Sequence, residues 1–357
     1  MGIFKEVLGA EESLFRDHIP LDYDYIPKPI LHRENEQQHI AMCIKPLLAK
    51  RNGRNLFLYG LPGVGKTAAC KQLLKELEEE TEEIIPLYIN CWQKNTAYKI
   101  ILSICEMLEY RFTQNKKTDE LFDIAKNMLN KKAVVFVFDE VDKLEEEDIL
   151  YYVLENIYRK TVILITNYKE WIAELDNRIK SRLTAELLEF KPYNELETRD
   201  ILKHRLQYAF TPDVWEADAF AIVAKKAFEL QDIRAGLYLM KEAGNAAEDR
   251  ASRKITQEHV ETALRKLEEF SIKKTEELED EERFILSLVK QRPNSKIGDL
   301  FKLYQQNGGS QAYKSFQRKI NKLADNRFIA VKKLPGGKEG NTTIVSHIGS
   351  TKKLTEY

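Results

Sequence analysis

One octapeptide constrains the possible folds of this chain more than any other segment. Residues 60–67 read Gly-Leu-Pro-Gly-Val-Gly-Lys-Thr, after the apolar run Asn55–Tyr59 and before a helix-like stretch, Ala68–Glu80. A strand, a glycine-rich turn and a helix in this order are typical of a phosphate-binding loop. Glycines let successive backbone N–H groups point inward, and the helix adds the positive end of its dipole. The segment therefore predicts a nucleoside triphosphate site in an α/β fold.

The loop also predicts Mg²⁺ as a cofactor beside the nucleoside triphosphate, and the roles of single residues. Lys66 is expected to reach the β- and γ-phosphates, and the hydroxyl of Thr67 is expected to coordinate Mg²⁺. Further phosphate contacts are expected from the backbone of Gly60, Gly63, Val64 and Gly65.

Apolar runs of strand length alternate with helix-period segments in the first half of the chain. The helix-period segments include Ala97–Tyr110 and Leu121–Leu129. This alternation predicts a parallel sheet with helices on both faces. The expected strands are Asn55–Tyr59, Ile84–Ile89, Val134–Phe138, Thr161–Thr166 and a shorter candidate at Ala185–Phe190.

Two acidic residues follow the most apolar of these runs. Val134–Phe138 contains no polar residue, which is typical of a central buried strand. Asp139 and Glu140 should then emerge at its carboxyl end, where parallel sheets bind their ligands. Asp139 is expected to hold Mg²⁺ through water, and Glu140 to polarise the attacking water. Asn167, directly after the next strand, is expected to position that water and contact the γ-phosphate.

The pattern becomes purely helical beyond Lys191-Pro-Tyr193. Amphipathic stretches cover Thr198–Ala209, Asp218–Leu230 and Ile233–Ala247, which indicates a small all-helical domain reaching about Phe270. Thr256 is expected to cap one more helix, with His259 at its third position.

The net charge of −1 hides a basic C-terminal module. Residues 283–357 contain 15 Lys and Arg against 4 Asp and Glu, a balance of +11, so the rest of the chain carries −12. This asymmetry favours contact with a polyanion, and a merely solubilising basic surface is the alternative. A charged link, Lys273–Glu282, should precede the module.

The module is expected to fold as a winged helix–turn–helix. Its predicted helices and strands are Arg283–Gln291, Ile297–Gln306, Gln311–Asn326, Phe328–Leu334 and Thr342–His347. In the third helix Ser310 is the expected cap, and Phe316, Ile320 and Leu323 form the buried stripe. The opposite side should face DNA with Lys314, Gln317, Arg318, Asn321 and Lys322, and the wing should contribute Lys332, Lys333 and Lys338.

Composition excludes several other classes of protein. The four cysteines form no C-x-x-C pair, so neither a disulfide framework nor a zinc site is indicated. No apolar run approaches the roughly 20 residues that cross a membrane, and the N-terminus lacks the apolar core of a secretory signal. We expect a cytoplasmic, nucleoid-associated location.

Together these motifs resemble the AAA+ ATPases, and within them the archaeal replication initiators of the origin-recognition/cell-division-control type. The resemblance rests on the order and spacing of many segments. They are Tyr25-Ile-Pro27, Leu31-His-Arg-Glu34, Gly60–Thr67, Phe138–Asp142, Leu164–Asn167, Leu175–Leu183, Phe190–Tyr193, Ile201–Arg205 and Asp232–Ala235.

The resemblance implies roles for residues that no simpler pattern assigns. Asn167 matches the sensor-1 position, and Arg234 matches sensor 2 on the helical lid. Arg182, with Arg178 before it, matches the arginine finger that serves ATP on a neighbouring subunit. Tyr193 and Arg205 match lid positions that contact the nucleotide. The chain departs from the family at Gln231, where glycine is usual.

The implied protein is an ATP-dependent binder of double-stranded origin DNA with slow, regulatory hydrolysis. The implied partners are the replicative helicase, which it helps to load, and other initiator subunits. Gln93–Tyr110 matches an inserted element that touches DNA in the family. The rival interpretations are a clamp-loader subunit, a transcription regulator and a transposon- or plasmid-associated AAA+ protein. The expected domains are 1–190 for the nucleotide-binding core, 191–272 for the lid, 273–282 for the link and 283–357 for the winged helix.

Overall fold

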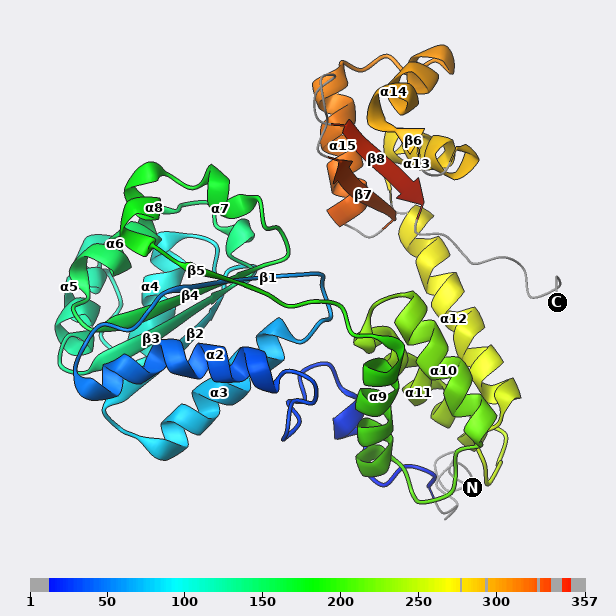
Figure 1. Ribbon diagram of the computed structural model, residues 1–357, viewed down its shortest axis with the longest axis horizontal. Coiled ribbons are helices and arrows are strands. Elements are labelled where there is room, and N and C mark those ends of the chain that lie inside the picture. Colours follow the sequence, from blue (N-terminus) through cyan, green and yellow to red (C-terminus); the bar gives the residue numbers. More distant parts are fainter. Residues whose placement is uncertain (1–12, 277, 293–294, 326–327, 335–341, 348–357) are drawn as a thin grey trace. The chain divides into compact units, whose positions relative to one another are not determined.

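The computed structural model describes residues 13–276, 278–292, 295–325, 328–334 and 342–347. The chain divides into two compact units, residues 1–264 and residues 265–357 (Figure 1). Each unit is built around its own sheet. In the described part of the chain, no helix is long and apolar enough to cross a membrane.

The first unit contains a five-stranded parallel sheet in the order β2-β3-β4-β1-β5. All five predicted strands are confirmed, with boundaries shifted by one residue at most ends. The central position of β3 explains its sequence, because all seven of its residues are buried. The strands are β1 (Leu56–Tyr59), β2 (Ile84–Asn90), β3 (Ala133–Asp139), β4 (Lys160–Thr166) and β5 (Glu186–Glu189).

Helices cover both faces of this sheet, as predicted (Figure 1). One face packs against α2 (Glu34–Ile44) and α3 (Lys66–Glu80). The other face packs against α4 (Ala97–Met107), α5 (Thr118–Leu129), α6 (Asp148–Asn156) and α8 (Asn177–Leu183). The short α7 (Trp171–Glu174) and three 3₁₀ segments, Ile19–Leu21, Lys45–Ala49 and Val141–Lys143, lie in the connections.

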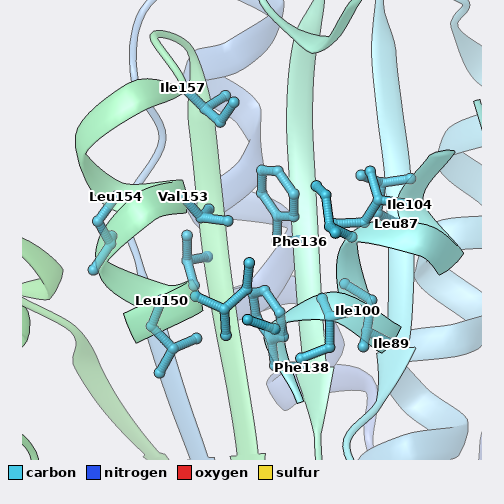
Figure 2. Packing of buried hydrophobic residues seen from close by; sticks show 14 of the residues in the cluster. Leu87, Ile89, Ile100, Ile104, Phe136, Phe138, Leu150, Val153, Leu154 and Ile157 are labelled. Atoms are coloured by element: carbon cyan, nitrogen blue, oxygen red, sulfur yellow. The ribbon is translucent and has the colours of Figure 1, made fainter. Parts of the chain in front are cut away.

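Alternate residues of β3 supply the two apolar cores. Val135 and Val137 belong to the cluster on the α2 and α3 face. Phe136 and Phe138 point to the opposite face, where they pack with Ile100 of α4 and with residues of α6 (Figure 2). This alternation follows from the two-residue side-chain period of a strand, and it makes β3 the rigid centre of the unit.

The lid consists of α9 (Glu195–Ala209), α10 (Ala217–Glu229), α11 (Ile233–Glu248) and the start of α12 (Gln257–Glu276). Thr256 directly precedes α12, as predicted, and its N–H donates to Nδ1 of His259, the third residue of the helix, at 3.0 Å. The N-terminal segment is fastened to this lid. The Arg16 N–H donates to the carbonyl of Ala209 at 2.9 Å, and the ring of Phe15 lies 4.7 Å from that of Phe210.

Beyond the end of α12, the described residues of the second unit form three helices and a small antiparallel sheet, in the element order of a winged helix. The elements are α13 (Asp280–Gln291), β6 (Ser295–Lys296), α14 (Ile297–Gln306), α15 (Tyr313–Asp325), β7 (Ile329–Leu334) and β8 (Thr342–His347), with sheet order β6-β8-β7. The predicted stripe of α15 is confirmed, since Phe316, Ile320 and Leu323 are buried. Strand β6 was not predicted, because two residues carry no periodicity.

The charged segment Lys273–Glu282 is largely helical where it is described, since α12 continues to Glu276 and α13 begins at Asp280. Its Lys and Glu residues are good helix formers. One local prediction in this region is wrong. Ser310 does not cap α15, which begins at Tyr313. The Gln311 N–H instead donates to the hydroxyl of Tyr304 at 3.2 Å, which prolongs the loop.

Burial predicts how much each aromatic residue stabilises the first unit. Phe136 is 0% exposed, so Phe136→Ala should lower the free energy of unfolding by about 3–5 kcal/mol. Phe112 is 78% exposed, and Phe112→Ala should change it by less than about 0.5 kcal/mol. Urea unfolding followed by circular dichroism checks both, and equal losses would contradict the assignment of β3 to the core.

Candidate nucleotide-binding site and DNA-binding face

The phosphate-binding loop lies between β1 and α3 and needs its glycines. Gly63 has a φ of +81° and Gly65 a φ of +92°, in the left-handed region that glycine adopts readily. A Cβ at Gly63 would lie 2.3 Å from Oδ1 of Asp232, and a Cβ at Gly65 would lie 2.7 Å from the hydroxyl of Tyr193. The loop backbone therefore packs directly against the lid and its connection. The turn forms the cradle that the sequence predicts.

Lys66 is the first residue of α3, and its side chain turns back over the loop. Its ammonium donates to the carbonyls of Gly60 at 2.7 Å and Leu61 at 2.9 Å. It also donates to Oδ1 of Asn167 at 2.9 Å. Residues 101 positions apart in the chain thus meet at the loop, as expected for a lysine and a sensor that serve the same phosphate group.

Asp139 and Thr67 meet beside the loop. Oδ2 of Asp139 accepts hydrogen bonds from the Thr67 hydroxyl at 2.6 Å and from the Tyr88 hydroxyl at 2.7 Å. Oδ1 accepts from the Glu140 N–H at 2.9 Å. A hydroxyl and a carboxylate side by side are the oxygen donors that Mg²⁺ prefers, so the pair fits this ion.

Glu140 is half-buried and directed into the same pocket. Its backbone has a φ of +53°, a strained conformation of the kind found at functional positions. Burial raises the pKa of its carboxyl, and the negative charges of Asp139 and Asp142 raise it further. Lys143 and Arg234 act in the opposite direction. The carboxylate is therefore more basic than an ordinary Glu, which suits a group that polarises water.

These groups line a cavity of about 390 Å³. The loop, Asp139, Glu140 and Asn167 form one wall, and Arg234 of the lid contributes to another. The volume is in the range of pockets that hold small molecules, roughly 300–1,000 Å³. Sequence reasoning gave no role to Tyr88 or to the N-terminal segment, which also lines the cavity with residues such as Tyr23, Asp24 and Ile26.

Tyr193 and Arg205 lie in the cavity wall, although their polar groups have protein partners. The guanidinium of Arg205 donates to the carbonyls of Pro20 at 3.1 Å and Tyr25 at 3.3 Å. Burial lowers its pKa to about 10. Its charge therefore holds the N-terminal segment against the lid. The Tyr193 hydroxyl accepts a hydrogen bond from Nε of Arg33 at 3.1 Å.

The backbone before α11 shows why glycine is usual at the position of Gln231. Gln231 has a φ of +50°, a conformation that glycine adopts at less cost. The next residue, Asp232, caps the helix by accepting from the Arg234 N–H at 3.0 Å. The departure thus leaves the cap and the position of Arg234 intact.

Arg182 is not among the residues that line the cavity of its own chain. It lies on α8, where its Nε is 2.5 Å from Oε2 of Glu155 and its guanidinium lies 4.7 Å from the ring centroid of Tyr151. Arg178 pairs with Asp176 at 3.2 Å. Both arginines are on the surface, as a residue that serves a neighbouring subunit would be.

A second set of candidate residues lies on α15. Lys314, Gln317 and Arg318 are exposed, and they form no ion pair with any other described residue. Lys322 differs, because its ammonium lies 2.6 Å from Oε1 of Glu282, a side chain that is 2% exposed. Lys322 therefore compensates a buried carboxylate, while its own side chain is 52% exposed, and its contact with DNA stays a prediction. Lys338 and the side chains of Lys332 and Lys333 lie outside the described residues.

A group of potential metal ligands lies away from the cavity. Donor atoms of His39, Cys43 and Glu186 fall within 4.8 Å of one another. Arg54, however, lies 2.8 Å from Oε1 of Glu186 and already supplies a positive charge to this carboxylate. We interpret the group as an ion pair of Arg54 and Glu186, with His39 and Cys43 beside the carboxylate.

Comparison with known proteins identifies the family. The sequence matches the family described as an AAA domain over residues 49–169 and the Cdc6 AAA+ ATPase-type lid domain over residues 199–265. The ORC1-type DNA replication protein 1 of Sulfurisphaera tokodaii is 35% identical over 282 residues, 74% of this chain and 71% of that protein. The chain belongs to the ORC1-type DNA replication protein family. The resemblance stated from the sequence is confirmed.

Other members of the ORC1-type family support the same conclusion over more of the chain. The Archaeoglobus fulgidus protein is 30% identical over 349 residues, which are 90% of this chain and 84% of that protein. The structure of the Aeropyrum pernix ORC1 protein in complex with DNA has a TM-score of 0.70 at 26% identity, covering 96% of this chain and 95% of that one. Cdc6p from Pyrobaculum aerophilum shares the fold, with a TM-score of 0.65 at 19% identity and 94% of each chain covered.

Membership of the ORC1-type family decides two further points. The chain carries the AAA domain, and membership of the AAA+ ATPases implies nucleotide binding. The comparisons do not favour the clamp-loader, transcription-regulator and transposon or plasmid alternatives.

The charges around Glu140 predict a pH dependence of ATP turnover. Asp142→Asn keeps the acceptor for the Thr166 hydroxyl, 2.8 Å away, but removes a charge that raises the Glu140 pKa. The Glu140 pKa should fall, so the acidic limb of the turnover profile should move to lower pH. Lys143→Met removes a charge that lowers this pKa and should move the limb to higher pH. Phosphate release measured against pH checks both, and identical profiles would show that Glu140 does not set the limb.

Proposed function

We propose that the chain is an ATP-controlled replication initiator that recognises origin DNA and helps to load the replicative helicase. The observation that carries the proposal is the convergence of Lys66, Thr67, Asp139, Asn167 and Arg234 on one cavity in a chain of the ORC1-type family. This function implies a cytoplasmic, nucleoid-associated location and contact with other initiator subunits.

Each group in the cavity has a chemical task in this proposal. Thr67 and Asp139 would hold Mg²⁺, which neutralises charge on the phosphates when it is bound. Lys66 would move from the loop carbonyls to the β- and γ-phosphates. Glu140 would accept a hydrogen bond from the attacking water and draw away its proton, while the Asn167 amide orients that water. Arg234 would face the charge that develops on the γ-phosphate.

In this proposal, the nucleotide bound in the cavity controls the position of the lid. Arg234 and Arg205 belong to the lid, whereas Lys66 and Glu140 belong to the part built on the parallel sheet. Bound ATP would therefore hold these two parts of the first unit together. Slow hydrolysis would then remove the γ-phosphate that Arg234 contacts, and the population would shift between the conformations of the lid. Arg182, which does not line the cavity of its own chain, would complete the site of a neighbouring subunit.

Two substitutions separate nucleotide binding from turnover. Glu140→Gln should leave ATP affinity near that of the wild type and abolish phosphate release, because only the basic carboxylate is lost. Lys66→Ala should weaken ATP binding itself, because it removes the charge that meets the phosphates. Nucleotide titration and phosphate release on both variants check the pair. Wild-type turnover in Glu140→Gln would remove Glu140 from the mechanism.

The second unit is proposed as the main DNA contact. Its basic balance of +11 opposes −12 in the rest of the chain, and the exposed face of α15 presents both positive charge and amide groups. We propose Gln317 and Arg318 as readers of base edges. Lys314 and the wing residues Lys332, Lys333 and Lys338 are proposed as phosphate contacts.

The two kinds of DNA contact predict different losses. Arg318→Ala should lower the preference for origin over random duplex by about 1–3 kcal/mol, the range for one base contact. Lys332→Ala should weaken all sequences alike and flatten the slope of log K against log salt by about 0.9. Lys225→Ala, which removes an exposed lysine of the lid, is the control and should change neither quantity. Binding at several salt concentrations measures both, and an unchanged preference in Arg318→Ala would exclude base reading by Arg318.

A further inference from the structure

Arg33 is a buried arginine at the start of α2 that the proposed chemistry does not use. Its side chain is 6% exposed, and every nitrogen of its guanidinium has a partner. Nε donates to the carbonyl of Val64 at 3.0 Å and to the Tyr193 hydroxyl at 3.1 Å. Nη2 donates to the carbonyl of Lys191 at 2.5 Å, and Nη1 donates to Glu36 at 2.8 Å.

These partners belong to two segments that are far apart in the sequence. Val64 lies inside the phosphate-binding loop, between Gly63 and Gly65. Lys191 and Tyr193 lie in residues 191–194, which join the sheet to α9 and which we call the core–lid connection. One planar group therefore bonds to the loop that would hold phosphate and to the segment from which the lid begins.

Ring contacts fix the guanidinium in this position. Its central carbon lies 4.0 Å from the ring centroid of Tyr193 and 5.3 Å from that of Phe190. Because a guanidinium donates in fixed directions from a rigid plane, it cannot follow Val64 and still reach Lys191 unless both acceptors move together. A lysine ammonium at this position has freely rotating donors on a flexible stem, so it would not hold the two carbonyls in one fixed relative direction.

The energetics favour a role beyond packing. A buried ion pair such as that of Arg33 and Glu36 is weak support for stability, because removing two charges from water offsets much of their attraction. A buried charge bonded to two separate carbonyls is suited instead to fixing one relative arrangement of those segments.

We propose that Arg33 is a positioning residue that couples the phosphate-binding loop to the core–lid connection, so that nucleotide in the loop is sensed by the lid. A nucleotide that displaces the Val64 carbonyl changes the hydrogen bond to Nε, and the guanidinium transfers the change to Lys191 and Tyr193. This inference rests on the proposed nucleotide-controlled function and adds the residue that transmits the signal.

The experiment compares Arg33→Lys and Tyr193→Phe with Arg54→Lys as the matched control. Arg33→Lys keeps the charge and loses the rigid planar donor group, and Tyr193→Phe keeps the ring and loses one acceptor. Arg54 is a surface arginine whose side chain is 50% exposed and paired with Glu186. Measured for each are thermal unfolding without nucleotide, ATP and ADP affinity, and hydrogen exchange of α9 and α11 with and without ATP.

In wild type and Arg54→Lys, ATP should slow exchange in α9 and α11. In Arg33→Lys this protection should fall by roughly 10-fold, a typical coupling between two sites, while ATP still binds. In Tyr193→Phe, part of the protection of α9 and α11 by ATP should be lost. Wild-type protection in both variants would overturn the proposal, as would an equal loss in Arg54→Lys. If Arg33→Lys does not fold, Tyr193→Phe alone decides. Failure of the wild type to bind ATP would instead overturn the proposed function.

Discussion

The parallel pairing of β3 with β4 and of β4 with β1 determines where the polar groups of the cavity lie. Phe138 pairs with Leu164 and Tyr59 pairs with Thr166, so the three strands end at the same edge of the sheet. The next residues along the chain are Asp139, Asn167 and the phosphate-binding loop. The hydrogen bonds from Lys66 to Asn167 and from Thr67 to Asp139 are consequences of this register. A shift of one residue would turn these side chains to the other face.

The apolar cores on both faces make this edge rigid. Because β3 is buried along its whole length, its end cannot move without disturbing two clusters. The strained backbone of Glu140 is stable only on such a support. The lid lacks this continuity with the sheet. Polar contacts bring it to the cavity instead, including Arg205 on the N-terminal segment and Arg33 on the core–lid connection, and such contacts can be exchanged when a ligand binds.

Some basic side chains of the second unit are paired with carboxylates, so the net charge of the unit does not show which of them are available to DNA. Lys319 and Lys322 are one turn or less apart from Arg318 on α15, and both pair with Glu279, at 2.8 Å and 3.5 Å. Lys322 also compensates the buried Glu282. The charges of Lys314 and Arg318 have no such partner among the described residues, so a count of basic residues overstates the surface that DNA can meet. Electrostatic complementarity therefore depends on a few side chains.

The five strands of the parallel sheet, most of the helices and the residues of the phosphate-binding loop could be predicted from the sequence, because these follow from apolar periodicity and glycine spacing. The sequence also determined Asp139, Glu140 and Asn167, since strand ends can be located along the chain. Only the tertiary structure decided the partners of Arg33, Tyr88 and Lys322. Apart from Glu36, the acceptors of Arg33 are 31 to 160 residues away, that of Tyr88 is 51 away, and those of Lys322 are 40 and 43 away. No local pattern encodes which distant oxygen a buried donor meets.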